Sequence, residues 1–395
     1  MPKQYYFESG NFQDLSFAEL VSVFNTFGLN KDTIHRYSNN ILLVKSNDIS
    51  EEVLKKVFNR LGGFIRFGYI IEDLDTFLND FSKKEDKVIF GLSILGNPES
   101  TDSRFLRKLG KQIKVGLKEV GRPSRFVNPL SRSSALNSAQ IVGNSILEKG
   151  FELCIIRTEN EEIYGSTISV QDVDGFAKRD MDKPHTDLEM GTLPPKLARI
   201  MVNLTGRKDG IVWDPFCGSG TILMEAGILG FDLLGSDIDE KAIEYTEKNI
   251  EWLSGIGEIG DVKYKVFQMD VTNPPARIVS DLKKTEVKCV VCEPYMGPPQ
   301  RRVLFPNRAD VYLERVKALY LGLIDILNRF AHEGFVVVVI IPSYKTHTGW
   351  KTFSIRDIFD KKWDVVNGEL CKGRDLMWKR KNSIITRNIF VLRRR

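Results

Sequence analysis

The sequence predicts an α/β chain whose C-terminal half folds as a mostly parallel sheet with helices on both faces. Two observations predict this fold. Apolar runs alternate with helical patterns from residue 206 onward, and glycine or acidic residues stand where the strands should end. The expected strands are Ile211–Trp213, Asp232–Ser236, Tyr264–Gln268, Val287–Cys292 and Phe335–Ile341, and the expected helices are Gly220–Leu229, Asp239–Leu253 and Ala309–Ala331. Such alternation is typical of a parallel sheet buried on both faces.

The length of the chain predicts more than one domain, because 395 residues exceed what one hydrophobic core usually organises. We expect a small α/β N-terminal module over residues 1–82, a second module over 83–170, a linker with a helix over 171–205, and the sheet domain over 206–395. Helices are expected at Ser16–Phe27 and Ser50–Leu61, each with its first serine as the N-cap. The charged segment Lys83–Lys87 separates the first module from a strand at Val88–Ile94, and the linker ends in a helix at Pro195–Leu204.

The composition excludes several classes of protein. With 42% hydrophobic and 28% charged residues, the chain is neither disordered nor membrane-embedded, and its longest apolar run, Phe335–Pro342, is too short to span a bilayer. The N-terminus lacks a secretory pattern, so we expect a cytoplasmic protein. Five cysteines favour reduced thiols over a disulfide framework. Cys289 and Cys292 have C-x-x-C spacing but no second pair, so we expect buried strand cysteines and no metal site.

Residues 104–120 form a predicted amphipathic helix with one basic face. Apolar residues recur at helical spacing at Leu106, Leu109, Ile113, Leu117 and Val120. The residues that we expect to contact nucleic acid are Arg104, Arg107, Lys108, Lys111, Lys114 and, beyond the helix, Arg125. The only acid between Ser103 and Arg132 is Glu119, so this face is suited to phosphates. The alternative is an ordinary solvated helix surface.

A glycine turn follows the first strand of the C-terminal domain, in the segment Asp214–Thr221. Parallel sheets bind ligands beyond the carboxyl ends of their strands, and Gly218 and Gly220 allow the backbone to approach such a ligand closely. The spacing matches neither a dinucleotide fingerprint nor a phosphate loop. Asp237 ends the second strand, where a carboxylate can bind ribose hydroxyls, and Asp270 ends the third, where it can accept from an adenine amine.

The segment Asp214–Thr221 resembles the D-P-F-C-G-S-G-T motif of RNA methylases that carry a THUMP domain. The upstream signature, Gln171-Asp172, Phe176, Arg179-Asp180, Pro184 and Gly191–Ala198, is similar to that of the tRNA guanosine-10 N2-methyltransferases. The resemblance implies a Rossmann-like methyltransferase domain preceded by a THUMP-like RNA-binding domain, with S-adenosylmethionine as cofactor and tRNA or another RNA as partner. It implies cofactor-binding roles for Asp214, Phe216, Gly218, Ser219, Gly220, Asp237, Asp270, Leu193 and Pro194. Arg179 and Asp180 are equally consistent with a structural ion pair.

The fourth strand ends in Cys292-Glu293-Pro294-Tyr295, where amino-methyltransferases of this class carry [DNS]-P-P-[YFW]. An exocyclic amine becomes a better nucleophile when nearby groups accept hydrogen bonds from its protons, because this localises the nitrogen lone pair. An aromatic side chain can stack on the flipped-out base at the same time. We therefore expect Glu293 to accept the amine proton and Tyr295 to stack the base. The motif departs from the family pattern, because Cys292 stands where Asp or Asn belongs and Glu293 replaces the first proline. A solvated loop acid is the alternative reading of Glu293.

These features favour methylation of an exocyclic base amine of RNA, with tRNA guanosine N2 as the preferred target. A DNA adenine-N6 or cytosine-N4 methyltransferase is the alternative within the same chemistry. A non-catalytic RNA-binding protein with a decayed catalytic motif is the alternative of another class, and a protein partner subunit is left open. Further basic residues, Arg301-Arg302, Trp378–Lys381 and Arg393–Arg395, add positive charge around a strand expected at Ser383–Leu392.

Overall fold

The computed structural model describes residues 3–82, 86–96, 103–130, 133–186 and 192–395. Lys83–Glu85 of the predicted charged segment and Gly191 of the upstream signature lie outside the described residues. The chain divides into two compact units. Unit 1 comprises residues 1–13, 29–59 and 63–175, and unit 2 comprises residues 14–28, 60–62 and 176–395. Each unit has its own sheet.

Unit 1 is built on an eight-stranded sheet in the order β2-β3-β1-β4-β8-β7-β5-β6. Its strands are β1 (Gln4–Ser9), β2 (Ile34–Arg36), β3 (Ile41–Lys45), β4 (Phe64–Ile71), β5 (Val88–Leu95), β6 (Ser124–Val127), β7 (Gly150–Arg157) and β8 (Glu162–Val170). β5 runs parallel to both of its neighbours, and the other pairs are antiparallel. Residues 1–82 and 83–170, which we expected as two modules, contribute to one sheet, because β4 pairs with β8.

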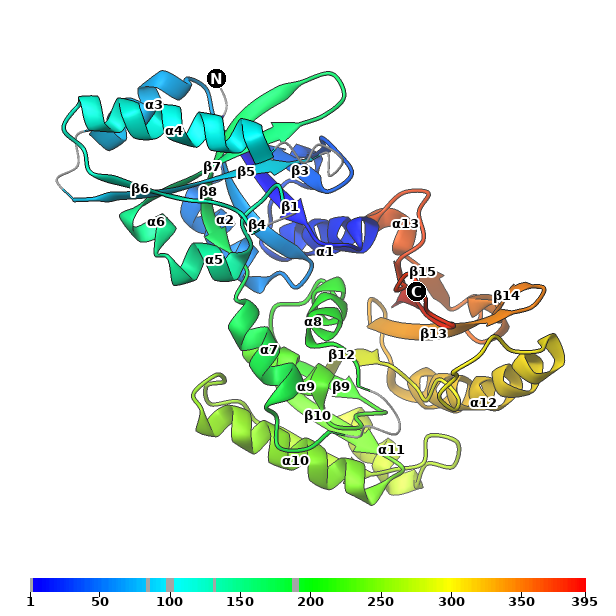
Figure 1. Cartoon of the computed structure of the whole chain (residues 1–395). Helices are drawn as coiled ribbons and strands as arrows, with labels where there is room; N and C mark the ends of the chain where they lie inside the picture. The colour runs from blue at the N-terminus through cyan, green and yellow to red at the C-terminus, as the bar shows by residue number, and fades with distance from the viewer. Residues whose placement is uncertain (1–2, 83–85, 97–102, 131–132, 187–191) are drawn as a thin grey trace. The chain divides into compact units, whose positions relative to one another are not determined.

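Helices cover both faces of this sheet (Figure 1). They are α2 (Glu51–Arg60), α3 (Leu74–Ser82), α4 (Ser103–Glu119), α5 (Ser138–Gly143) and α6 (Ile146–Lys149), with a short 3₁₀ turn η1 (Lys31–Thr33). The predicted N-cap of α2 is confirmed, since Ser50 Oγ accepts from Val53 N at 3.3 Å. The apolar face of α4 packs on Phe90 and Phe151. Val120 was wrongly assigned to that face: α4 ends at Glu119, and Val120 is exposed.

Unit 2 contains the predicted parallel sheet, in the order β11-β10-β9-β12-β13-β17-β15. Its strands are β9 (Ile211–Asp214), β10 (Asp232–Asp237), β11 (Tyr264–Gln268), β12 (Val287–Cys292), β13 (Val336–Thr346), β14 (Gly349–Lys351), β15 (Trp363–Val365), β16 (Met377–Trp378) and β17 (Ile385–Arg394). The five strands from β11 to β13 are parallel, whereas β17 and β15 are antiparallel. The strand order reverses between β9 and β12, where such sheets bind ligands.

The helices of unit 2 bury both faces of the sheet. Besides α1 (Gln13–Thr26), they are α7 (Val173–Met181), whose first three residues belong to unit 1, α8 (Pro195–Leu204), α9 (Thr221–Ile228), α10 (Glu240–Gly255), α11 (Ala276–Lys284), α12 (Pro306–Phe330) and α13 (Asn367–Leu370), with a 3₁₀ turn η2 (Ile355–Asp357). Tyr320 of α12 and Leu282 of α11 belong to one core with Trp213 and Val337. α8 contacts α9, and α10 contacts β10 and β11. α7 occupies part of the segment that we expected to be a linker.

The N-terminal helix α1 (Gln13–Thr26) packs within unit 2. It begins three residues before Ser16, which is buried inside the helix, so the expected N-cap at Ser16 is wrong. The Glu19 carboxylate accepts from the backbone N of Gly62 and from Asn203 Nδ2, each at 2.7 Å. Ser22 Oγ donates to the carbonyl of Asn203 on α8, also at 2.7 Å. A buried polar network thus joins the start of the chain to the helix that precedes β9.

Candidate active site

The glycine turn lies between β9 and α9. Gly218 and Gly220 both have positive φ, +53° and +78°, which explains glycine at each position. A Cβ on Gly220 would lie 3.1 Å from the side chain of Thr246, so this residue is held against α10. A Cβ on Gly218 would meet no atom within 4 Å. The turn is therefore tight on one side and open to a ligand on the other.

Neighbouring elements hold this turn in place. The backbone N of Gly218 donates to Asp237 Oδ2 at 3.0 Å, and its carbonyl accepts from Thr246 Oγ1 at 2.9 Å. Lys183, which is buried, donates to Ser219 Oγ at 3.2 Å and to Thr221 Oγ1 at 2.9 Å. Burial lowers the pKa of Lys183 to about 8. No local sequence pattern singles out Lys183, because its partners lie 36 and 38 residues away.

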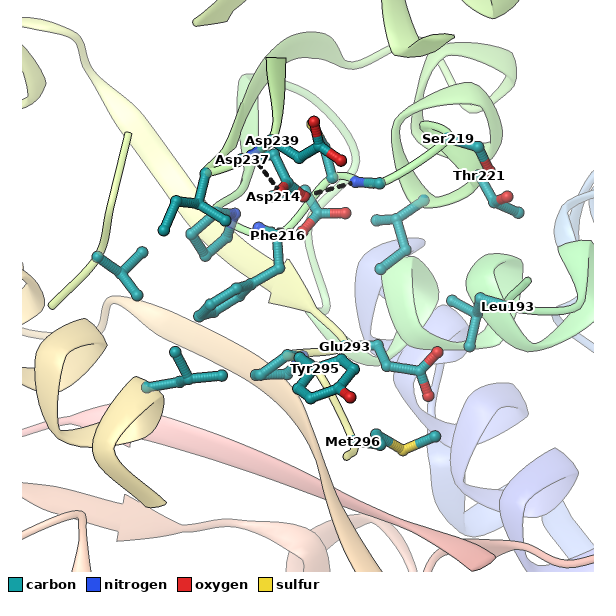
Figure 2. A pocket seen from close by; sticks show the side chains of 18 of the residues that line it. Leu193, Asp214, Phe216, Ser219, Thr221, Asp237, Asp239, Glu293, Tyr295 and Met296 are labelled. Carbon is teal, nitrogen blue, oxygen red and sulfur yellow. Dashed lines mark hydrogen bonds between the residues drawn. The ribbon is translucent and has the colours of Figure 1, made fainter. Parts of the chain in front are cut away.

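A cavity of about 670 Å³ lies at the carboxyl ends of the parallel strands. Figure 2 shows Asp214, Asp237 and Asp239 on one side of it, with Glu293, Tyr295 and Met296 on the other. The predicted residues that line it are Leu193, Asp214, Phe216, Gly218, Ser219, Asp237, Asp270, Glu293, Pro294 and Tyr295. Pro194, Gly220 and Cys292 are not among the lining residues. Lining residues that sequence analysis missed include Asp239, Met269, Leu319, Ile385 and Arg387.

The acids of this cavity give it a negative character. Asp214 is 1% exposed, and its Oδ1 accepts from the backbone N of Phe216 at 3.1 Å. Burial raises the pKa of Asp214 well above its usual range, and the charges of Asp237 and Glu293 raise it further. Burial also raises the pKa of Asp237. Each shift is relieved when a positive charge binds nearby, so the cavity favours a cationic ligand.

Asp270 follows β11 and lines the same cavity. Its Oδ1 accepts from the backbone N of Thr272 at 2.8 Å and from Thr272 Oγ1 at 2.7 Å. These two bonds fix the carboxylate at the strand end. Asp237 and Asp270 thus lie at the ends of neighbouring strands and line one cavity.

The end of β12 forms the opposite wall of the cavity. Glu293 is paired with Arg387 of β17, with Nε to Oε1 at 2.6 Å and Nη2 to Oε2 at 3.4 Å. The Tyr295 side chain is 47% exposed. Tyr344 Oη donates to the carbonyl of Met296, and a Cβ on Gly297 would clash with that hydroxyl at 2.4 Å. The tyrosine therefore fixes the backbone that presents Glu293 and Tyr295.

The two cysteines of β12 are buried, as expected for strand residues. Burial raises the pKa of Cys289 to about 12. The pKa of Cys292 is also raised, mainly by burial and further by the nearby charges of Asp214 and Glu293. Cys292 lies in the hydrophobic core with Tyr320. Across the described residues, no group of three or more histidine, cysteine, aspartate or glutamate side chains is arranged to hold a metal ion. Nor does any helix within the described ranges have the length and apolar character needed to cross a membrane.

Arg179 of the upstream signature and the nearby Arg199 pack against α9 through Glu225. The possible pairing of Arg179 with Asp180 is not what the structure shows: Arg179 Nε binds Glu225 Oε1 at 2.7 Å. Arg199 Nη2 binds the other oxygen of Glu225 at 2.6 Å. The guanidinium groups of both arginines lie over the ring of Phe176, 4.7 and 5.3 Å from its centroid. These residues are structural, because they form a buried cluster behind the glycine turn.

The six residues expected to bind RNA lie in unit 1. The five on α4, Arg104, Arg107, Lys108, Lys111 and Lys114, are all exposed. Arg125 is also exposed, and its Nη2 donates to Asn144 Oδ1 at 2.9 Å. Leu106, Ile113 and Leu117 are buried on the opposite face of α4. The helix thus separates an apolar face from a basic one, as its sequence predicted.

Residues 185–297 match the family described as RMKL-like, methyltransferase domain. The matched segment contains the glycine turn, both strand-end acids and the Glu293–Gly297 wall of the cavity. Unit 2 therefore carries a methyltransferase domain, and its largely parallel sheet has the Rossmann-like methyltransferase fold.

Two archaeal relatives share a narrower description. Over 156 residues the chain is 33% identical to the tRNA (guanine(10)-N2)-dimethyltransferase of Methanothermobacter thermautotrophicus. The matched segment covers 39% of this chain and 40% of that protein. Over 303 residues it is 24% identical to the protein of the same name from Methanocaldococcus jannaschii, which covers 74% of this chain and 82% of that one. The chain thus spans about two fifths of the first relative's length. The crystal structure of TrmN from Thermus thermophilus is similar with a TM-score of 0.51 at 14% identity, over 99% and 100% of the two chains, which shows a shared fold.

Proposed function

We propose that this chain is an S-adenosylmethionine-dependent methyltransferase that acts on the N2 amine of a guanosine in tRNA. The observation that carries the proposal is that one cavity joins the glycine turn to the Glu293–Tyr295 strand end. A cofactor beside the turn and a base beside the strand end would meet in that space. The names of the two archaeal relatives support tRNA as the substrate and guanine N2 as the target. A tRNA substrate also supports a cytoplasmic location.

The lining of the cavity fits S-adenosylmethionine, which supplies an electrophilic methyl group on a sulfonium. The open side of Gly218 allows close approach of the backbone. Asp237 is the expected acceptor for the ribose hydroxyls, and Asp270 for the adenine amine. The negative lining complements a sulfonium cation, and a volume of about 670 Å³ is within the usual range for a ligand of this size. Leu193 lines the same cavity, apart from Asp214, Asp237 and Asp239 (Figure 2), and is the candidate contact for the methionine end.

Glu293 and Tyr295 are the proposed catalytic residues. The Glu293 carboxylate accepts a hydrogen bond from the base amine, which localises the nitrogen lone pair for attack on the methyl carbon. Arg387 fixes the direction of that carboxylate through two hydrogen bonds. Tyr295, which is half exposed at the cavity, stacks the flipped-out base. The basic face of α4 and Arg125 are proposed to bind phosphates, with residues 83–170 acting as a THUMP-like part.

The test is transfer of labelled methyl from S-adenosylmethionine to unmodified bulk tRNA, compared with rRNA and duplex DNA. Nucleoside mass spectrometry then identifies the product. N2-methylguanosine or its dimethyl form in tRNA would support the proposal. Label in DNA alone would favour an adenine-N6 or cytosine-N4 methyltransferase. Cofactor binding without transfer to any nucleic acid would favour a non-catalytic RNA-binding protein.

A further inference from the structure

β13 continues past the end of the catalytic strand. Its last pair with β12 joins Val339 to Cys292, whereas residues 340–346 run on, and Tyr344 among them donates to the carbonyl of Met296, which lines the cavity. They are supported by β17, in register from Ile340–Ile389 to Ser343–Thr386, and by the short strand β14. Ile385 and Arg387, from the same part of β17, line the cavity. The sheet thus extends a wall along the side where a base would enter.

Three surface segments, 301–308, 345–351 and 379–381, meet on this extension, and we call them the projecting wall. The backbone N of Leu304 donates to the carbonyl of Lys345 at 3.1 Å, and His347 N donates to the carbonyl of Leu304 at 3.2 Å. Lys345 N donates to the carbonyl of Ile384 at 2.7 Å, which brings the turn before β17 alongside. These bonds fix the segments relative to one another within unit 2.

The projecting wall is strongly basic. Its cations are Arg301, Arg302, Arg308, Lys345, Lys351, Lys379, Arg380 and Lys381. None of the three segments contains an aspartate or a glutamate. Lys351 is neutralised by Asp310, at 2.6 Å. The exposed positive charge beside the cavity is therefore largely uncompensated within the wall, which attracts a polyanion.

Exposed aromatic rings stand among these cations. Phe305 is 67% exposed, and its ring lies 5.1 Å from that of His347. Trp350 is 40% exposed, with Lys379 Nζ 4.4 Å from its ring centroid. Rings that alternate with cations suit bases and phosphates in alternation, which is how proteins bind single-stranded nucleic acid. A membrane or apolar protein surface would instead require a continuous apolar patch.

We propose that the projecting wall binds the single-stranded RNA that flanks the target nucleotide. Bases stack on Phe305 and Trp350, while Arg380 and Lys381 contact phosphates. This inference rests on the proposed function, because a base that leaves its stack for the Glu293–Tyr295 site needs its neighbours held nearby. It assigns RNA contacts to the catalytic unit itself, separate from those proposed for α4.

The test measures binding of a short, fluorescein-labelled, single-stranded oligoribonucleotide to the full chain by anisotropy over a range of salt concentrations. Two variants remove parts of the wall: Arg380→Ser with Lys381→Ser, and Phe305→Ala with Trp350→Ala. The matched control is Lys283→Ser with Lys284→Ser, which removes two exposed charges from the end of α11. The charge variant should weaken binding and flatten the salt slope by about one to two. The aromatic variant should weaken binding about tenfold or more without changing that slope.

Methyl transfer to tRNA is measured in parallel, so that this inference and the proposed function fail separately. Weakened oligonucleotide binding supports the wall even where no RNA is methylated, which would reject only the proposed activity. If wild type methylates tRNA while both wall variants bind and turn over like the control, the wall has no role and the inference is overturned. Binding of polyglutamate as tightly as the oligonucleotide would also overturn it, because the wall would then recognise charge without bases.

Discussion

Arg387 donates to both carboxylate oxygens of Glu293, although 94 residues separate them in the sequence. The two side chains are 23% and 15% exposed, so the ion pair is largely shielded from water. Arg387 comes from β17, which runs antiparallel to the catalytic half of the sheet. The residue that replaces the first proline of the strand-end motif therefore has a dedicated partner and is not a solvated loop acid.

Replacing Glu293 tests its assignment as the acceptor of the amine proton. Glu293→Ala should lower kcat about a hundredfold or more, because the amine loses the group that localises its lone pair. Affinity for S-adenosylmethionine, measured by calorimetry, should stay nearly unchanged. Glu286→Ala is the control, since that side chain is 84% exposed at the far end of β12. Equal turnover in Glu293→Ala and wild type would refute the assignment.

Arg387 is a positioning residue in this account, and a conservative replacement separates that role from simple folding. Arg387→Met should lower kcat about tenfold or more and leave KM for the cofactor close to wild type, because only the direction of the Glu293 carboxylate is lost. Arg387→Lys should recover part of the rate. The double variant Arg387→Met with Glu293→Ala should have nearly the same kcat as Glu293→Ala alone. Fully additive losses would show that the two residues act independently.

Because acids line the cavity, we expect its preference for a positively charged cofactor over a neutral one to depend on pH. Because the pKa values of Asp214 and Asp237 are raised, both carboxyls hold their protons to higher pH than usual. A sulfonium favours the ionised carboxylates, so its binding releases protons and strengthens as pH rises. Calorimetry should therefore show the affinity ratio of S-adenosylmethionine to neutral S-adenosylhomocysteine increasing from about pH 5 to about pH 8. A constant ratio would contradict the electrostatic account.

The basic face of α4 predicts a salt-sensitive contribution to RNA binding. Lys111→Glu with Lys114→Glu should weaken binding of tRNA and lower its salt slope by about one to two, because a phosphate that the protein no longer contacts keeps its counterions. Lys31→Glu with Lys45→Glu, two exposed lysines elsewhere in unit 1, is the matched control. An unchanged salt slope in the α4 variant would assign that helix to an ordinary solvated surface.

The network around Glu19 predicts a large effect on stability. Glu19→Ala removes the acceptor of two buried donors, Gly62 N and Asn203 Nδ2, and the negative charge facing Arg60. Losing this acceptor, while Asn203 Nδ2 keeps its bond to the carbonyl of Arg60, should lower the free energy of unfolding by about 2–4 kcal/mol. Denaturant titration measures this loss, with exposed Glu52→Ala as the control. A change below about 0.5 kcal/mol would show that water replaces the carboxylate.

The parallel half of unit 2 was predictable because its signals are local. Tyr264–Gln268, Val287–Cys292 and Pro195–Leu204 appear at the bounds expected from apolar periodicity and helix-start chemistry. The glycine turn and the strand-end acids could also be predicted from the sequence, because the carboxyl ends of successive parallel strands lie along one edge of the sheet. β13 runs on to Thr346, past the apolar run that ends at Pro342, because antiparallel pairing with β17 supports it to Ser343 and pairing with β14 supports it from Tyr344.

Features that depend on distant pairing were missed. Arg387 lies in a strand whose sequence alone does not show which face its side chain occupies, so its partner Glu293 could not be anticipated. α7 lies in a polar stretch with little helical periodicity, and packing of Phe176 between arginines stabilises it. The place of α1 in unit 2 depends on Asn203, whose side chain gave no signal in the sequence.

The position of α1 has a consequence for synthesis. This helix leaves the ribosome early, but its partner carbonyl on Asn203 lies 181 residues beyond Ser22. At about 5–20 residues per second, translation takes roughly 10–40 s to reach that partner. During this interval Ser22, which is buried in the finished protein, lacks its hydrogen-bond acceptor on α8. The catalytic unit therefore cannot fold in the order in which it is made, and its completion waits for a chain segment that follows all of unit 1.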